Sequence, residues 1–588
     1  MDWKRLDRAR SSVGPIELDL IESYAQGKVS RRDFVKRGTV IGLSMPVMGA
    51  IIAACGSDDE PSGGGGDTSA GGTTPPATEP AGGGDTTPPP PPSSGGGVVW
   101  ANQQGDANSG LDPVNMLDLG TYNVCSQSFE YLVGLGPDGN IAATALATDW
   151  SPNADGSEWT FNLRPGVKWQ DGSDFTSADV AATMDRLAAA GNAGLGGVIE
   201  EGAVDASDPL VAKFTLIEAN GNFPVLVSIF NAQSLIAPAD YSSGTTLNER
   251  PAGTGAWILD SFDVATSTAK FNRNPNWWGG TTPLDTIELR GFADIGTAVT
   301  AMASREVDGV QQFSVIGGEG LLNDGNFTVL EPPASNHRQL WFNWQQGQFA
   351  GDEARLVRQA MAWCWDREQM LSTLFNGRGK IANDHPILDS LPFYDPDIVP
   401  QRSRDIDMAK SLLAEAGVDS VNANIESGDL QEIPQLAEIM KQNAAEAGIN
   451  LTVNVQSNST FYGDSWCPGP SESDPTLPCD NASEFGIVDY GHRPIPDIFL
   501  GSALATGGVW NSSNYANDEF DQKLSEYRTA VDVAGQKAAI SRIQEIVWTD
   551  LPASYAYFYS FLSGHDSSVS GVEVTSLGHC ILSGASKS

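Results

Sequence analysis

Hydrophobic and polar positions follow different patterns on the two sides of residue 98. Before it, the one long apolar stretch covers residues 39–54, and the segment that follows is polar or rich in glycine and proline. From residue 98 onward, short runs that alternate apolar and polar residues, such as 159–163, are typical of half-buried strands. The pair Asp155-Gly156 precedes this run, and Asp-Gly between such runs predicts a tight turn.

Longer segments of the same region have the spacing of amphipathic helices. Ser177 is a candidate N-cap for a helix that reaches residue 187. Residues 352–375 place apolar side chains on one stripe that includes Cys364, which predicts a single helix with one buried face. Further helices are predicted at 407–417, 434–448 and 518–551. Strands that alternate with helices predict an α/β fold.

Residues 1–54 have the features of an export signal. The pair Arg31-Arg32 resembles a twin-arginine motif, and a general secretory signal is the alternative. The apolar run at 39–54 is shorter than the roughly 20 residues of a membrane-spanning helix and fits a signal peptide. It ends in Ala53-Ala54-Cys55, a lipobox pattern, so we expect cleavage before Cys55 and lipidation of its thiol.

The segment 55–97 predicts a lipidated cysteine followed by a tether. After Cys55, nearly all of its residues are Gly, Pro, Ser, Thr, Ala or acidic, with five consecutive prolines at 88–92. Such a chain cannot bury enough apolar surface to fold, and about 42 flexible residues reach roughly 35 Å. We therefore expect an extracytoplasmic protein that a lipid anchor holds at the outer face of the cell membrane.

The charge of the chain narrows its class of partners. There are 74 acidic and 34 basic residues, which gives a net charge of −40. A surface of this sign repels nucleic acid, so nucleic-acid binding is excluded as a function. The acidity serves either to steer cationic ligands or to keep an exported surface soluble.

Several blocks, in this order along the chain, resemble the family-5 extracellular solute-binding proteins. The longest block covers residues 155–180 and contains Trp159, Pro165-Gly166 and Trp169-Gln170-Asp171-Gly172. The others are 111–113, 131–134, 146–150, 253–257, 272–280, 306–308, 341–343 and 357–367. This family supplies the dipeptide-, oligopeptide- and nickel-binding components of ABC importers, and the resemblance spans roughly residues 100–565.

The resemblance implies a fold and a division into domains. The fold is a two-lobed clamshell of the periplasmic-binding-protein type (type II) with an extra inserted domain. Lobe I would comprise 98–140, 247–336 and 557–588, the inserted domain 141–246, and lobe II 337–556. We expect a monomer that encloses a solute between its lobes and delivers it to a membrane permease.

The resemblance also suggests where a ligand is held. Family peptide binders contact the ligand's α-amino group through an aspartate that matches Asp489, which is followed by Tyr490. Two departures from the family pattern stand beside it: Gly486 replaces a tryptophan, and Gly491-His492-Arg493 replaces a tighter turn. A cap or turn role for Asp489 is the alternative.

Other candidates for the ligand site are charged or aromatic. Arg338, next to His337, is a candidate partner for a ligand carboxylate, or else forms a salt bridge within the protein. Tyr122, Tyr131 and Trp510 are candidate aromatic walls, or ordinary core residues.

The cysteines fit an exported protein. Cys467 and Cys479 enclose a polar loop twelve residues apart and predict a disulfide in an oxidising compartment. Cys364 is expected to be a free core thiol, and the pairing of Cys125 and Cys580 stays open. We find no zinc-type spacing and no cofactor motif.

A receptor that captures di- or oligopeptides is the function that these patterns favour. The same role for an oligosaccharide, opine, haem or nickel is the first alternative. A lipid-anchored secreted hydrolase is a weaker one, because the sequence has no G-x-S-x-G, Walker A or metalloprotease motif, and we expect no enzymatic activity. A receptor that signals or adheres is the third.

Overall fold

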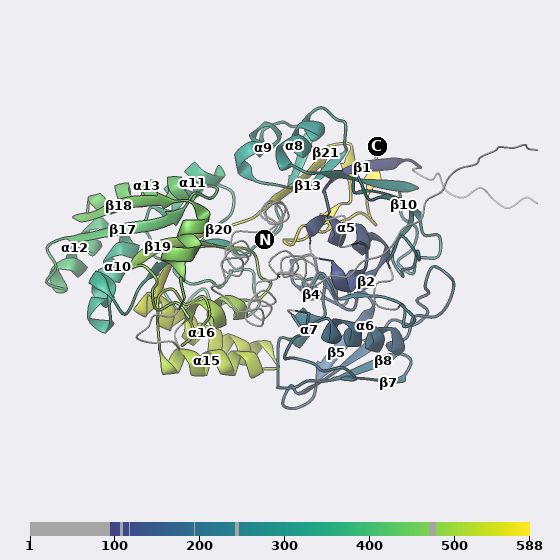
Figure 1. The fold of residues 1–588 in the computed structure, drawn as a ribbon, viewed down its shortest axis with the longest axis horizontal. Helices are drawn as coiled ribbons and strands as arrows, with labels where there is room; N and C mark the ends of the chain where they lie inside the picture. The colour runs from purple at the N-terminus through teal and green to yellow at the C-terminus, as the bar shows by residue number, and fades with distance from the viewer. Residues whose placement is uncertain (1–94, 106–109, 117, 193, 242–245, 470–477) are drawn as a thin grey trace, which may run out of the picture.

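The computed structural model describes residues 95–105, 110–116, 118–192, 194–241, 246–469 and 478–588. The predicted signal, Cys55 and most of the predicted tether lie outside these residues. The described chain forms two halves, each built on a large sheet (Figure 1). Among the residues described, no helix combines the length and apolar character that crossing a bilayer needs.

The first half contains a seven-stranded mixed sheet. Its strands, in order across the sheet, are β10 (Trp257–Asp263), β11 (Thr268–Arg273), β12 (Thr286–Phe292), β1 (Gly97–Gln103), β13 (Gly309–Phe313), β21 (Leu562–Asp566) and β14 (Phe327–Leu330). β1 lies in the centre and runs parallel to both β12 and β13. Trp100 on β1 is fully buried, and the resulting core fixes the register of β1.

The second half contains a six-stranded sheet. Its strands are β16 (Lys380–Ile381), β20 (Ala553–Tyr559), β15 (Asn336–Phe342), β19 (Phe485–Tyr490), β17 (Val421–Gly428) and β18 (Ile449–Gln456). Every residue of β15 and β20 is buried. Such strands are covered on both faces, and their sequences therefore lack simple alternation.

The chain passes between these two sheets twice. It leaves the first sheet after β14 and enters the second at β15, and it returns between β20 and β21. The Ser560 hydroxyl donates a 2.7 Å hydrogen bond to the Pro332 carbonyl, which ties the two connections together. The lobe boundary expected at 556/557 falls inside β20, because Tyr557 and Phe558 still pair with β16, so the crossing lies at residues 560–561.

A four-stranded antiparallel sheet extends the first half. Its order is β5 (Ala147–Pro152), β6 (Glu158–Leu163), β8 (Val211–Thr215) and β7 (Val204–Asp208). Phe161 and Phe214 of this sheet belong to the same buried cluster as Trp100. The remaining strands of the described residues form four two-stranded ribbons: β2 (Glu130–Tyr131) with β9 (Leu235–Ile236), β3 (Gly134–Leu135) with β4 (Ile141–Ala142), β22 (Val569–Ser570) with β25 (Ser586–Lys587), and β23 (Glu573–Val574) with β24 (Cys580–Ile581).

The helices differ from the sequence prediction at three places. The N-cap of α6 is Thr176, not Ser177, because Asp179 completes a capping box with Thr176. The helix expected at 352–375 is divided, and Asp366 caps its second part. The helix expected at 518–551 is also divided, because Asp532 caps a new helix.

The helical segments of the first half are η1 (Pro113–Asn115), α5 (Leu119–Ser128), α6 (Ser177–Ala189), α7 (Phe223–Leu226), α8 (Ile295–Ala303) and α9 (Val315–Leu322). Those of the second half are η2 (Gly347–Phe349), η3 (Asp352–Ala354), α10 (Arg355–Cys364), α11 (Arg367–Phe375), α12 (Ile406–Glu415), α13 (Ile433–Ala445), α14 (Asn458–Thr460), η4 (Phe461–Trp466), η5 (Phe499–Leu504), α15 (Asp518–Thr529) and α16 (Val533–Asp550).

A seam away from the crossing also joins the two halves. It lies where residues 220–222, just before α7, meet the junction of α15 and α16 at the lower edge of Figure 1. The Gly221 amide donates a 2.8 Å hydrogen bond to the Arg528 carbonyl, and Gln536 donates one of 2.9 Å to the buried Asn222 side chain. A Cβ on Gly221 would stand 1.7 Å from the Ala530 carbonyl oxygen, so glycine is required for this approach.

A buried charge cluster stabilises the second half. The Asp384 carboxylate accepts hydrogen bonds from Arg367 at 2.7 Å, from Ser554 at 2.5 Å and from Arg402. Burial acts to raise the pKa of Asp384, but the two arginine charges and these hydrogen bonds outweigh it and hold the pKa below its ordinary value. The cluster therefore keeps Asp384 ionised inside the core.

Candidate functional site

Asp489 lies near the end of β19, directly opposite Arg338 of β15. Because residues opposite each other on adjacent strands project to the same face, these two side chains are neighbours. Asp489 is half-buried, and the Tyr462 hydroxyl donates a hydrogen bond to its Oδ1 atom. Burial first, and then the Asp489 charge, raise the pKa of Tyr462, so this hydroxyl stays a donor.

Arg338 is committed to a partner within the protein. Its Nε and Nη2 atoms donate to the two carboxylate oxygens of Glu432 at 2.7 and 3.0 Å, and both side chains are almost fully buried. Nη2 also donates to Gln431 Oε1 at 2.8 Å, and the guanidinium lies over the Tyr559 ring, 4.8 Å from its centroid. Arg338 thus forms the salt bridge within the protein that was the alternative to ligand binding, and its contact with a ligand carboxylate stays a prediction.

The opposite face of β15 and β19 is aromatic. Tyr490 lies 5.8 Å from Trp510 between ring centroids and 5.7 Å from Phe499. His337, fully buried, packs 4.7 Å from Phe499. Trp510 is half-buried at the rim of this cluster and Tyr490 lies inside it. Asp489 and Tyr490 thus project from opposite faces of one strand end, and Tyr462 of the aromatic cluster reaches across to donate to Asp489.

Two short π-helical segments, η4 and η5, flank this strand end. η4 supplies Tyr462 and Trp466, and η5 supplies Phe499. π-helical turns are rare and occur often at functional sites. Tyr462 and Trp466 are not among the residues predicted from the sequence, although the closely spaced aromatic residues just before Cys467 are a signal for them.

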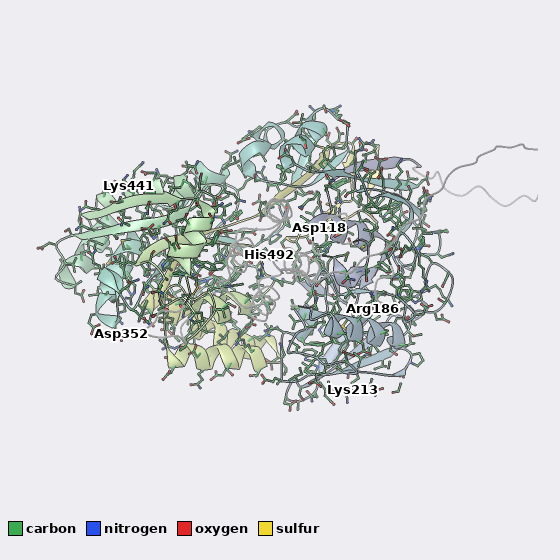
Figure 2. The ribbon with its side chains drawn as sticks, in the orientation of Figure 1. Asp118, Arg186, Lys213, Asp352, Lys441 and His492 are labelled. Atoms are coloured by element: carbon green, nitrogen blue, oxygen red, sulfur yellow. A yellow bond between two sulfur atoms is a disulfide. The ribbon has the colours of Figure 1, made fainter. Side chains whose placement is uncertain are left out.

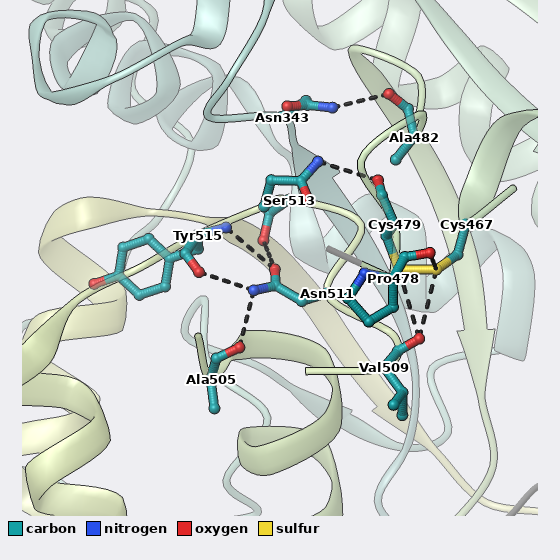
Figure 3. Close-up of a disulfide and its surroundings, with 11 residues drawn as sticks. Asn343, Cys467, Pro478, Cys479, Ala482, Ala505, Val509, Asn511, Ser513 and Tyr515 are labelled. Atoms are coloured by element: carbon teal, nitrogen blue, oxygen red, sulfur yellow. Dashed lines mark hydrogen bonds between the residues drawn. A yellow bond between two sulfur atoms is a disulfide. The ribbon is translucent and has the colours of Figure 1, made fainter. Parts of the chain in front are cut away.

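A disulfide fixes the end of η4. Cys467, the next residue, is bonded to Cys479, the pair that the sequence singles out, with the two Cα atoms 4.4 Å apart (Figure 3). The small pocket beside the bond is lined by Gln345, Pro478, Cys479, Thr506, Gly507, Gly508, Asn511, Asn514, Tyr515 and Ala516. The Asn511 amide group there donates to the Ala505 and Tyr515 carbonyls, so it braces the loop.

The remaining predicted site residues lie elsewhere. Tyr131 is buried in the core of the first half, where its hydroxyl contacts the Ala232 carbonyl at 3.1 Å and His579 at 3.0 Å. Tyr122 packs against the same core. The structure therefore does not bring these two tyrosines to Asp489. Three further cysteines are free and buried: Cys125, Cys364 and Cys580.

His492 connects the site to the crossing and to the first half (Figure 2). Its Nδ1 atom accepts the Ser335 amide at 3.0 Å, so the neutral ring carries its proton on Nε2, 2.7 Å from Ser576 Oγ. Burial, with a smaller contribution from the Arg493 charge, lowers the pKa of His492 to about 3. The turn after Tyr490 therefore joins the two halves through the uncharged ring of His492.

This strand end presents a half-buried carboxylate, Asp489, and a half-buried aromatic side chain, Trp510. Within the described ranges, no group of three His, Cys, Asp or Glu side chains is arranged to hold a metal ion. The arrangement is suited to binding a small polar molecule with an apolar part.

Comparison with known proteins gives the chain its relatives. It is 24% identical to the glutathione-binding protein GsiB of Shigella boydii over 472 residues, 78% of this chain and 89% of that protein. The corresponding protein of Pectobacterium atrosepticum is 22% identical over 498 residues, 81% and 92% of the two chains.

Solved structures show the same fold. The unliganded open form of the periplasmic murein tripeptide binding protein MppA matches 84% of this chain and 97% of its own, with a TM-score of 0.72 and 21% identity. A nickel ABC transporter protein from Bacillus halodurans matches 83% and 99%, with a TM-score of 0.69 and 21% identity. The fold is therefore that of the type II periplasmic binding proteins.

The family model described as bacterial extracellular solute-binding proteins, family 5 Middle, matches residues 142–467, more than half of the chain. The chain therefore belongs to the family 5 bacterial extracellular solute-binding proteins, which are substrate-binding receptors of ABC transporters and not enzymes.

Proposed function

We propose that this receptor captures short peptides by their free α-amino group and delivers them to an ABC permease. The observation that carries the proposal is the state of Asp489. Its neighbour Arg338 is held by Glu432, so Asp489 is a half-buried carboxylate whose hydrogen-bond donor is the neutral Tyr462 hydroxyl.

An ammonium group is the natural partner of such a carboxylate. A charge-assisted hydrogen bond is roughly twice as strong as a neutral one, and a ligand without the charge leaves the carboxylate without a cation. The aromatic residues Trp510 and Tyr490 at the same strand end suit an apolar side chain of the peptide. Two of the relatives named above carry names that refer to peptides, glutathione and a murein tripeptide.

The proposed receptor works outside the cytoplasm on a lipid anchor at Cys55. The six-stranded half would be lobe II, and the seven-stranded half lobe I with the four-stranded sheet as its inserted domain. A peptide that contacts both lobes would favour the closed arrangement over the open one by its extra contacts.

The test compares peptides that differ only in their amino terminus. Isothermal titration of the full chain with Ala-Ala-Ala, its N-acetylated form and glutathione measures the three affinities. We expect the free peptides to bind, and N-acetylation or Asp489→Asn to weaken binding about 10- to 100-fold, the value of one charge-assisted hydrogen bond. Asp464→Asn is the matched control, because Asp464 lies on η4 but is exposed.

Two results would contradict the proposal. Equal affinity of the free and the N-acetylated peptide would show that the amine is not recognised. Equal affinity of the wild type and Asp489→Asn for Ala-Ala-Ala would show that Asp489 is not the residue that recognises it.

A further inference from the structure

Three charged side chains lie together beside the proposed amine site. Arg338 stands between two carboxylates: Glu432, which it binds through both of its fork nitrogens, and Asp489, its opposite neighbour across the two strands. Side chains opposite each other on adjacent strands are within reach of one another. Of these two carboxylates, Arg338 is hydrogen-bonded to Glu432.

The backbone around Glu432 explains why this residue holds Arg338. Glu432 immediately precedes α13, and Gln431 before it adopts a left-handed conformation with φ of 49°. This turn directs both side chains to the guanidinium, where Gln431 Oε1 accepts from Nη2 at 2.8 Å. The Tyr557 hydroxyl, also buried, donates to Glu432 Oε1 at 3.1 Å and fixes the carboxylate in place.

Whether Asp489 can bind a ligand ammonium depends on which carboxylate Arg338 is paired with. A carboxylate that is paired with a guanidinium has its charge compensated and its oxygens occupied, so an incoming ammonium would have to displace the arginine. A carboxylate whose arginine neighbour is held elsewhere keeps its charge for the ligand. The position of Arg338 thus switches Asp489 between a structural and a binding role.

We infer that Glu432 is a positioning residue for ligand specificity: by holding Arg338 it keeps Asp489 available to an ammonium group. This inference rests on the proposed function, since it concerns how the same site selects its substrate class. It assigns a role to a residue that itself makes no contact with the ligand. It also gives Arg338 a role different from binding a ligand carboxylate.

The experiment removes the charge of Glu432 and measures the affinity for Ala-Ala-Ala and N-acetyl-Ala-Ala-Ala. In Glu432→Gln we expect Arg338 to turn to Asp489 and the affinity for the free peptide to fall at least about tenfold. The ratio of the two affinities should fall toward one. Glu438→Gln is the matched control, because Glu438 lies on the same helix and forms an exposed pair with Lys441.

A second substitution separates this role from a purely structural one. In Glu432→Gln with Arg338→Met, no cation competes for Asp489, and we expect the affinity for Ala-Ala-Ala to return to within about threefold of the wild type. If Glu432 only stabilised the fold, the double substitution would not restore selectivity for the free amine. If Arg338 bound the ligand carboxylate, the double variant would stay weak and would no longer distinguish Ala-Ala-Ala from its C-terminal amide. Either result would overturn the inference.

A buried arginine without its partner destabilises a protein, so folding is checked by circular dichroism and melting temperature. If Glu432→Gln does not fold, Glu432→Asp is used instead, because its shorter side chain keeps the charge but moves it away from the Arg338 guanidinium. A ratio of the affinities for Ala-Ala-Ala and N-acetyl-Ala-Ala-Ala equal to that of the wild type would then refute the inference. Failure of this inference can be told apart from failure of the proposed function. If the proposed function is wrong, the single substitution Asp489→Asn leaves the affinity for Ala-Ala-Ala unchanged.

Discussion

Replacement of His337 by phenylalanine should remove a defined part of the pH dependence of stability. His337 is fully buried, and its Nδ1–H group donates to the Ser335 carbonyl at 2.7 Å. Its ring lies between Phe499 and Tyr555, with centroids at 4.7 and 5.2 Å. Burial, helped by the nearby Arg338 charge, lowers the pKa of His337 to about 3. The folded protein therefore holds the neutral ring throughout the physiological range.

The size of the effect on the free energy of unfolding follows from the difference between the pKa of His337 in the folded protein and in the unfolded chain. An unfolded histidine has a pKa of about 6.5, so below this pH the unfolded chain binds a proton that the folded chain does not. The stability from this group is complete above pH 6.5 and is lost as the pH falls toward 3. Between pH 7.5 and 5.5 the free energy of unfolding falls by about 1.4 kcal/mol because of this one group.

The assay is urea unfolding followed by tryptophan fluorescence at pH 7.5 and 5.5. His337→Phe should show a drop in the free energy of unfolding that is about 1.4 kcal/mol smaller than the drop of the wild type. The lost hydrogen bond to Ser335 affects both pH values equally, so it cancels in this difference. Tyr555→Phe is the control, because it changes the same wall and removes no group that titrates in this range.

An unchanged pH dependence in His337→Phe would refute the reasoning. It would mean that the folded state binds the proton as readily as the unfolded chain, and that the aromatic wall does not keep His337 neutral.

Further predictions concern the disulfide, the buried charge cluster and the seam. The double substitution Cys467→Ser and Cys479→Ser should lower the free energy of unfolding by about 3 kcal/mol, the value expected for a disulfide that closes a loop of this length. A reducing agent should then have no further effect on the variant. A variant as stable as the oxidised wild type would contradict this prediction. Asp384→Asn leaves two buried arginines without their carboxylate and should cost about 3–5 kcal/mol, measured by calorimetry; a loss below 1 kcal/mol would show that the arginines find other partners. Gly221→Ala should expose the amides of the seam to hydrogen exchange without unfolding either half, whereas Gly320→Ala, at an open position, should not; unchanged protection at the seam would contradict the close approach described above.

The sequence predicts the α/β fold because its signals are local. Asp155-Gly156 makes the turn between β5 and β6 with Gly156 at φ of 76°, as the Asp-Gly pair requires. The two divided helices show the limit of this reasoning. Apolar periodicity continues through 365–366 and 530–532, and only the capping aspartates, Asp366 and Asp532, mark the breaks.

The proposed ligand site is harder to predict because its members come together only in the tertiary structure. Only the resemblance to the family points to Asp489 as a ligand residue, and this role stays a prediction. Glu432, which holds the Arg338 guanidinium, lies 94 residues from Arg338 in the chain, and no local pattern in the sequence links the two residues. Tyr131 lies within a motif of the family, yet the structure places it in the core of the first half, because a motif can reflect packing as well as binding.

The seam at Gly221 limits how the two halves can move. The halves are joined covalently at the crossing, where His492 also links them, and they meet again at the seam, which lies below the crossing in Figure 1. A rigid body that is held at two separated points retains one rotation, about the line through both points. A movement that keeps both attachments is therefore described by a single angle, and one pair of labels placed across the halves would record it completely.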